Sequence, residues 1–315
     1  PVIDDGATIV TCNNLEIQSG AHITIASNGK LTVTSNIVNN SGPEGIIIES
    51  DAVSTGSLIH STFGIQAACK RYLSNSNWHF VFTPLTDVPK DSLSLTLNGY
   101  TNPNLYWYNE TNEDYWDTES VYGTTGWSNE ASNFLSTNNG YIHYSPEIRT
   151  YEFAGGNLLS SDKEFILDYT DNGTGPVGMN GVSSDWDNFE GWNLIGNPYV
   201  SAFDWDHAGI DKSNIDDVIY YYDDQTDQYK YYGSGTVYNE GITVNGGSRY
   251  VPANQAFFVK AIGQGSFTIP NAARVHNDQA FWKNTEDPKN IVRLQIETDD
   301  YFDETVIRGI KESIL

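Results

Sequence analysis

The chain has 315 residues, more than one hydrophobic core usually supports, so we expect two or three domains. Its 41 acidic residues outweigh its 16 Lys and Arg residues, giving a formal net charge of −25. A surface of this sign repels phosphate groups, which excludes the ordinary electrostatic route to nucleic acids and anionic membranes. With 20 Tyr, 13 Phe and 8 Trp beside 28 Gly, the composition is typical of strands joined by tight turns.

Residues 1–66 predict a short β-solenoid-like segment that acts as a cap or spacer. Apolar residues recur there in pairs at a step of eight, between Gly-containing turns: Leu15 and Ile17, Ile23 and Ile25, Leu31 and Val33. Strict alternation bounded by turns is typical of short strands. Such strands can stack as a solenoid or pair as a β-meander, and we expect the solenoid.

The chain has two cysteines, Cys12 and Cys69. Their spacing matches no zinc or redox motif. Both alternatives stay open: one disulfide in an oxidising compartment, or two buried thiols. No run of about 18 apolar residues is present, so the sequence predicts no membrane-spanning helix.

The middle of the chain carries an internal duplication. The segment from Trp78 to Pro84 (WHFVFTP) recurs 114 residues later as WNLIGNP, from Trp192 to Pro198. Aromatic patterns follow at the same offset: Tyr106, Trp107, Tyr108 and Tyr115 in one copy, Tyr220, Tyr221, Tyr222 and Tyr229 in the other. A period this long indicates two whole modules, copy 1 at 67–175 and copy 2 at 176–285.

Each copy is expected to fold as a β-sandwich or barrel, so that the fold class is all-β. Residues 109–114 and 223–228 predict equivalent hairpin loops whose flanking aromatic residues lie opposite each other. Core packing and cross-strand aromatic pairs are expected for Trp78, Trp192, Tyr106 and Tyr220. Residues 286–315 predict the start of a further β element or a linker, with an alternating strand from Ile291.

Two motifs of copy 2 resemble a known group of proteins. They are GWNLIGNPY followed by FDWD, from Gly191 to Asp206, and VPANQAFFV, from Val251 to Val259. Together with the solenoid-like start, they are similar to duplicated β-rich modules of large secreted or cell-surface proteins of Bacteroidota, exported by type IX secretion. The resemblance implies a secreted or cell-surface location. It says little about activity, because similar modules accompany adhesins, proteases and polysaccharide-active enzymes.

Catalytic motifs are weak in this sequence. The six histidines form no His-x-His or His-Glu-x-x-His pattern, which disfavours a zinc hydrolase, and no Gly-x-Ser-x-Gly elbow is present. A glycosidase needs only two carboxylates, which the acid-rich sequence cannot exclude. We therefore name no catalytic residue.

Calcium is the cofactor that the acidic residues suggest. Asp168 and Asp171 lie at a loop that ends in Gly173, and Asp204 and Asp206 place two carboxylates on one side of an extended segment. Solvated loop acids and turn caps are the competing interpretation.

Aromatic residues outside the core predict a site for a polysaccharide or a cell-surface glycan, because the C–H face of a sugar ring packs on an aromatic ring. The candidates share a place in or beside the duplicated aromatic strands: Trp107, Tyr108, Trp116, Trp127, Tyr221 and Tyr229. We expect a non-catalytic extracellular surface or adhesin module that binds glycans. The alternative is an ancillary or catalytic region of a secreted polysaccharide-degrading enzyme.

Overall fold

The structure is a computed structural model of the chain. It describes residues 1–4, 8–73, 77–93, 95–97, 100–102, 104–110, 126–170, 190–223, 228–234, 241–279, 281, 291–298 and 301–308. The chain divides into two compact units, Pro1–Lys283 and Asn284–Leu315. In the second unit, β25 (Ile291–Thr298) pairs antiparallel with β26 (Tyr301–Arg308), so a strand begins at Ile291 as predicted.

The fold is all-β, which confirms the predicted class. The described strands form several separate sheets rather than a closed barrel. Helical structure among the described residues is limited to short 3₁₀ turns, which include η1 (Pro43–Gly45), η2 (Lys90–Leu93) and η4 (Asn271–Ala273). No helix in this part of the chain is long and apolar enough to cross a membrane.

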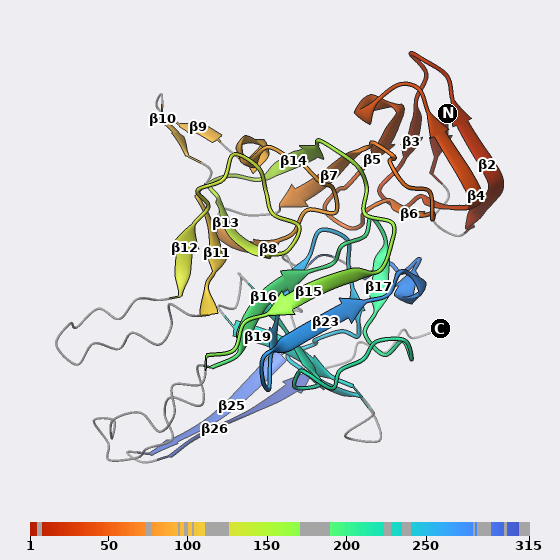
Figure 1. Ribbon diagram of the computed structural model, residues 1–315. Coiled ribbons are helices and arrows are strands. Elements are labelled where there is room, and N and C mark those ends of the chain that lie inside the picture. The colour runs from red at the N-terminus through yellow and green to blue at the C-terminus, as the bar shows by residue number, and fades with distance from the viewer. Residues whose placement is uncertain are drawn as a thin grey trace. The chain divides into compact units, whose positions relative to one another are not determined.

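The first strands stack as a solenoid. They are β1 (Val2–Ile3), β2 (Val10–Ile17), β3 (Ile23–Ile25), β4 (Lys30–Asn39), β5 (Ile46–Ile48) and β6 (Ser57–Ile59). They pair in parallel, β1 with β3 with β5 and β2 with β4 with β6 (Figure 1). Parallel pairing confirms the solenoid and excludes the meander. Apolar pairs eight residues apart in the sequence therefore lie in alternate sheets. Each coil of the solenoid contributes one strand to each of the two sheets.

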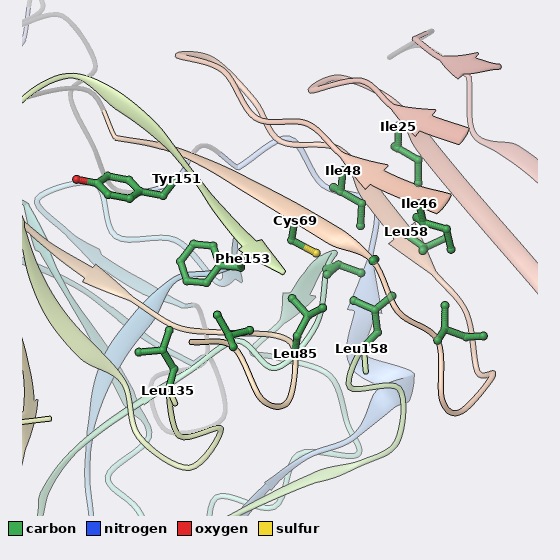
Figure 2. Close-up of a cluster of buried hydrophobic side chains, with 14 of the residues drawn as sticks. Ile25, Ile46, Ile48, Leu58, Cys69, Leu85, Leu135, Tyr151, Phe153 and Leu158 are labelled. Atoms are coloured by element: carbon green, nitrogen blue, oxygen red, sulfur yellow. The ribbon is translucent and has the colours of Figure 1, made fainter. Parts of the chain in front are cut away.

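Strand β7 (Ala68–Leu73) joins the solenoid to copy 1. It pairs in parallel with β5 on one side and antiparallel with β14 (Arg149–Ala154) on the other. Figure 2 shows the shared core, in which Ile48 and Leu58 of the solenoid lie in one cluster with Phe153 of copy 1. Each such buried side chain contributes about 1.5–3 kcal/mol. The packing is therefore continuous across the predicted boundary at residue 66.

The two copies have the same strand order. In copy 1 it is β12 (Trp127–Asn129), β11 (Leu105–Tyr108), β13 (Tyr141–Ser145), β8 (Asn77–Val81). In copy 2 it is β19 (Gln228–Gly233), β18 (Val218–Asp223), β22 (Ala256–Lys260), β16 (Trp192–Gly196), with β20 (Ile242–Val244) added beyond β19. Each copy adds a second antiparallel pair of strands, β7 with β14 and β15 (Lys163–Leu167) with β23 (Gly265–Ile269), of which the first is part of the solenoid's five-stranded sheet and the second is a sheet of its own. This pairing places β15 with copy 2, although the predicted boundary at residue 175 assigns it to copy 1.

The aromatic hairpin differs between the copies. In copy 2, Tyr222 lies opposite Tyr229 after a short loop, as predicted. In copy 1 the residue opposite Tyr108 is Trp127, so the chain returns much later than the predicted loop at 109–114. The structural counterpart of Tyr229 is therefore Trp127, and the prediction that Tyr115 would occupy this place is wrong. Tyr115 itself lies outside the described residues.

Trp78 and Trp192 occupy equivalent positions, each at the start of the edge strand of its sheet. The Trp78 ring lies 5.8 Å from Tyr106, and the Trp192 ring lies 4.9 Å from Tyr220. The expected aromatic pairs are therefore present, but all four side chains are half-buried rather than fully buried. Trp192 and Tyr220 pack against the core of copy 2 from its edge.

The remaining strands are short. A hairpin in copy 1 pairs β9 (Leu95–Leu97) with β10 (Tyr100–Asn102). In copy 2, β17 (Ala202–Asp204) pairs with both β21 (Tyr250–Val251) and β24 (Arg274–Val275). The segment from β24 onward crosses to the solenoid, and its alternate residues bond there: Arg274 to the carbonyl of His60, His276 to Ser57 and Thr32, Asp278 to Lys30.

Candidate binding site

The facing sheets of the two copies meet through aromatic rings. Phe80 of copy 1 lies 5.4 Å from Phe258 of copy 2 and 5.6 Å from Tyr222. Tyr108 crosses the same junction, 4.9 Å from Phe258 in an edge-to-face arrangement. Such pairs add about 0.5–1.5 kcal/mol each beyond their buried area. We call six residues the aromatic seam: Phe80, Tyr108, Trp127, Tyr222, Tyr229 and Phe258.

The seam has a buried floor and an accessible rim. Phe80 and Phe258 are 2% and 5% exposed. Above them Tyr108, Trp127 and Tyr222 are half-buried, and Tyr229 is 47% exposed. The Trp127 ring lies 6.3 Å from Phe80, and the Tyr229 ring lies 6.4 Å from it. The two structurally equivalent rim residues therefore flank one phenylalanine, one from each copy.

Strand alternation explains which rings reach the seam. In β8, Val81 points into the core of copy 1, while its neighbours Phe80 and Phe82 enter the core of copy 2. In β18, Tyr221 is fully buried and its hydroxyl donates to the carbonyl of Ser248 at 3.0 Å. Tyr222, one residue later, faces the seam.

Three of the predicted ligand residues converge at the seam: Tyr108, Trp127 and Tyr229. Trp107 points the other way and packs against the core that copy 1 shares with the solenoid. The prediction for Tyr221 is wrong, because a fully buried ring cannot stack on a sugar. Trp116 lies outside the described residues.

Sequence reasoning missed Phe80, Tyr222 and Phe258. The pairing register places Phe258 directly opposite Tyr220, while Phe80 belongs to the repeated WHFVFTP segment. The signal available in the sequence was the alternation of each strand, but alternation does not say which face meets the other copy.

Hydrogen bonds fix the two copies together around the seam. The backbone N–H of Phe82 donates to the carbonyl of Asn254 at 2.8 Å, and that of Gly140 donates to Leu194 at 2.7 Å. The amide of Gln255 donates to the carbonyl of Phe80 at 3.2 Å. Because Asn254 and Gln255 belong to the VPANQAFFV motif, part of this motif holds the copies in contact.

Glu110 adds a buried charge to this junction. Its carboxylate accepts from the backbone N–H and hydroxyl of Thr170, at 2.7 and 2.6 Å, and from the N–H of Gly191 at 2.9 Å. Glu110 is 2% exposed, so these three donors replace the water that its charge would otherwise need. Burial, together with the charge of Glu110, raises the pKa of the nearby Asp168.

The Gly196–Pro198 part of the GWNLIGNPY motif also stabilises the fold. Asn197 is fully buried, and its amide donates to the carbonyls of Ser201, Val251 and Pro252 at 2.8 to 3.1 Å. Its side-chain oxygen accepts from the N–H of Tyr199. Copy 1 carries Thr83 at this position, and the Thr83 hydroxyl accepts from the N–H two residues later in the same way.

The predicted calcium ligands are engaged by an arginine. Arg249 binds Asp204 through Nε and Nη2, at 2.8 and 2.5 Å, and its Nε lies 3.5 Å from Asp206. Asp206 also accepts from the Tyr232 hydroxyl at 2.5 Å. The guanidinium holds the pKa of Asp204 below its usual value despite the burial that would raise it. A cationic side chain thus already neutralises this pair, and a metal site here stays a prediction.

The other two predicted metal ligands do not form a site in the described chain. Asp168 is exposed, and Asp171 lies outside the described residues. Among the residues whose positions are known, no three His, Cys, Asp or Glu side chains gather closely enough to hold a metal ion.

Comparison with known protein families adds one result. A family described as a domain of unknown function (DUF8693) matches residues 1–299. The chain belongs to this family. The match spans the solenoid and both copies. No curated protein and no solved structure matches the chain.

Proposed function

We propose that the chain is a non-catalytic binding module that holds a polysaccharide or cell-surface glycan on the aromatic seam. The observation that carries this proposal is the rim: Tyr229 is 47% exposed beside half-buried Tyr222 and Trp127, over a floor of buried rings. Rings fixed in this way offer flat apolar surface at little entropic cost, and their polar edges suit sugar hydroxyls.

The partners of the buried carboxylates favour binding over catalysis. Glu110 is saturated by three donors, and Asp204 is held by Arg249. A glycosidase needs one carboxyl group free to protonate the leaving oxygen and a second to attack or to activate water. The carboxylates of Glu110 and Asp204 are instead engaged in bonds that stabilise the fold. This supports the binding module over the enzyme alternative.

We also propose a secreted or cell-surface location in a Bacteroidota protein exported by type IX secretion. The support is the resemblance of the GWNLIGNPY and VPANQAFFV motifs. The roles of Asn197 and Gln255 explain why such motifs would accompany this scaffold whatever its ligand. In this setting the chain would act as a surface or adhesin module.

Affinity electrophoresis tests the binding proposal. The protein is run in gels with and without a soluble polysaccharide, beside Tyr229→Ala and a control, Phe63→Ala. Phe63 is a 74% exposed ring in the solenoid, so its loss removes similar apolar surface away from the seam. We expect Tyr229→Ala to lower retention about tenfold, which corresponds to about 1.4 kcal/mol, and Phe63→Ala to leave it unchanged. Equal retention of both variants would contradict the seam as the site.

A further inference from the structure

Charge at the seam restricts the ligand beyond the general class of glycan, and the argument rests on the function proposed above. The chain as a whole carries −25 charges. A polyanionic glycan therefore meets repulsion unless the site supplies cations of its own. Whether the seam attracts or repels an acidic glycan therefore depends on the positive side chains beside it.

The lysine next to the exposed rim points away from it. Lys230 follows Tyr229 in β19, so alternation places its side chain on the opposite face of the sheet. There its ammonium lies 2.8 Å from the carboxylate of Asp223, and both side chains are largely buried. This charge is neutralised inside copy 2.

A second lysine, Lys260, lies two residues beyond Phe258. Its ammonium sits over the Trp192 ring, 5.7 Å from the ring centre. The carboxylate of Glu110 accepts from the N–H of Gly191, the residue immediately before Trp192. The Lys260 ammonium is therefore held against an aromatic face, and Glu110 adds a carboxylate to the junction of the two copies, two residues after Tyr108.

We propose that the aromatic seam is selective for uncharged polysaccharides and rejects chains that carry carboxylate or sulfate groups. The rim offers aromatic faces to sugar C–H groups, and phenol hydroxyls to neutral sugar hydroxyls. The negative charge of the whole chain then acts against acidic polymers that would otherwise stack on the same rings.

The test compares neutral and acidic polymers in affinity gels. The neutral probes are mixed-linkage β-glucan and galactomannan, and the acidic probes are alginate and polygalacturonate, each at low and at physiological ionic strength. We expect retention by at least one neutral polymer, insensitive to salt and lowered about tenfold by Tyr229→Ala. We expect no retention by either acidic polymer at low salt.

The outcomes separate this inference from the function on which it rests. Retention by alginate or polygalacturonate at low salt that Tyr229→Ala abolishes would overturn the selectivity while leaving the seam as a glycan site. If Lys260→Ala also removed that retention, Lys260 would be the cation responsible. Absence of retention in all four gels would overturn the proposed function itself. The Phe63→Ala variant serves as the control in each gel.

Discussion

Phe82 of copy 1 packs directly against Gly196 of copy 2. The 114-residue offset makes these two residues equivalent positions of the duplicated fold. A Cβ atom on Gly196 would lie 2.3 Å from Cγ of Phe82. Gly140 and Ala256, which the pairing register also makes equivalent, meet in the same place, since a Cβ on Gly140 would lie 2.8 Å from that of Ala256. Contacts between equivalent residues are the mark of a twofold interface. The two copies are therefore related by an approximate twofold axis that passes between these residues.

Substitution at this axis should show strong coupling. Gly196→Ala forces a Cβ into the Phe82 ring and should cost about 1–3 kcal/mol through overpacking. Phe82→Ala should cost about 3–5 kcal/mol through the cavity left in the core of copy 2. In the double variant the smaller side chain makes room for the new methyl group, so the loss should be less than the sum. Thermal melting of the four proteins gives the coupling.

Gly263→Ala is the matched control for that cycle. Nothing lies within 4 Å of a Cβ built there, and its backbone is not in the left-handed region. Its melting temperature should stay close to that of the parent. Additive losses in the Gly196 and Phe82 pair would show that the two residues do not press on each other.

Asn197 should be among the most costly polar residues to replace. Asn197→Ala leaves three backbone carbonyls and the N–H of Tyr199 without their side-chain partner in a fully buried turn. Each orphaned buried group costs about 1–3 kcal/mol, so the melting temperature should fall strongly. Asn36→Ala, on the exposed face of β4, should change it little. A similar small change for both would show that the turn does not depend on Asn197.

Acid should loosen the contact between the solenoid and copy 2. Burial and the charge of Lys30 lower the pKa of His276 from 6.5 to about 4, against the opposite effect of Asp278. The folded pKa is below the unfolded one, so the stability from neutral His276 is complete above about pH 6.5. It is lost as the pH falls toward 4. His60, whose pKa burial and Arg274 also lower to about 4, acts in the same direction.

Melting temperatures between pH 7 and pH 4 check this dependence. His276→Gln keeps a side chain able to bond to Ser57 and Thr32 but removes the titration, so its curve should fall less steeply. His22→Gln, at an exposed site in the solenoid, should follow the parent. Identical slopes for all three proteins would contradict a role for His276.

The two cysteines should react at different rates. Both are free thiols in the structure, with Cys12 half-buried and Cys69 1% exposed. Burial raises the pKa of Cys69 well above its usual range, which removes the reactive thiolate. A thiol reagent added to the native protein should label Cys12 first and Cys69 only after denaturation. Absence of any labelling after denaturation without reductant would indicate a Cys12–Cys69 disulfide instead.

The strands of the solenoid and of copy 2 could be predicted because their signals are local. Apolar alternation between Gly turns located β3 and β4, and the aromatic residues that flank the predicted loop at 223–228 located β18 and β19. The duplication was visible because WHFVFTP and WNLIGNP recur at a fixed offset. The sequence favours a solenoid over a meander but does not decide between them, and the parallel pairings of the structure, such as Ile23 with Ile46, do.

The candidate site was harder to predict because it depends on contacts distant in the sequence. Tyr221 is buried in copy 2, whereas its neighbour Tyr222 faces the seam. The local sequence does not indicate which face of β18 meets Phe80. Tyr115 matched Tyr229 in spacing, but pairing across β11 selects Trp127. Asp204 and Asp206 resembled a metal pair because Arg249, 45 residues away, gives no local sign of its approach.

The stoichiometry of glycan binding tests the central claim most directly, because the seam is built from both copies. Tyr108 and Trp127 come from copy 1, whereas Tyr222 and Tyr229 come from copy 2. Titration calorimetry with a soluble oligosaccharide of a neutral polymer retained in the gels should give one site per chain. Trp127→Ala and Tyr229→Ala should each weaken that single site. Two sites per chain, with each substitution removing one and sparing the other, would contradict a binding site shared between the copies.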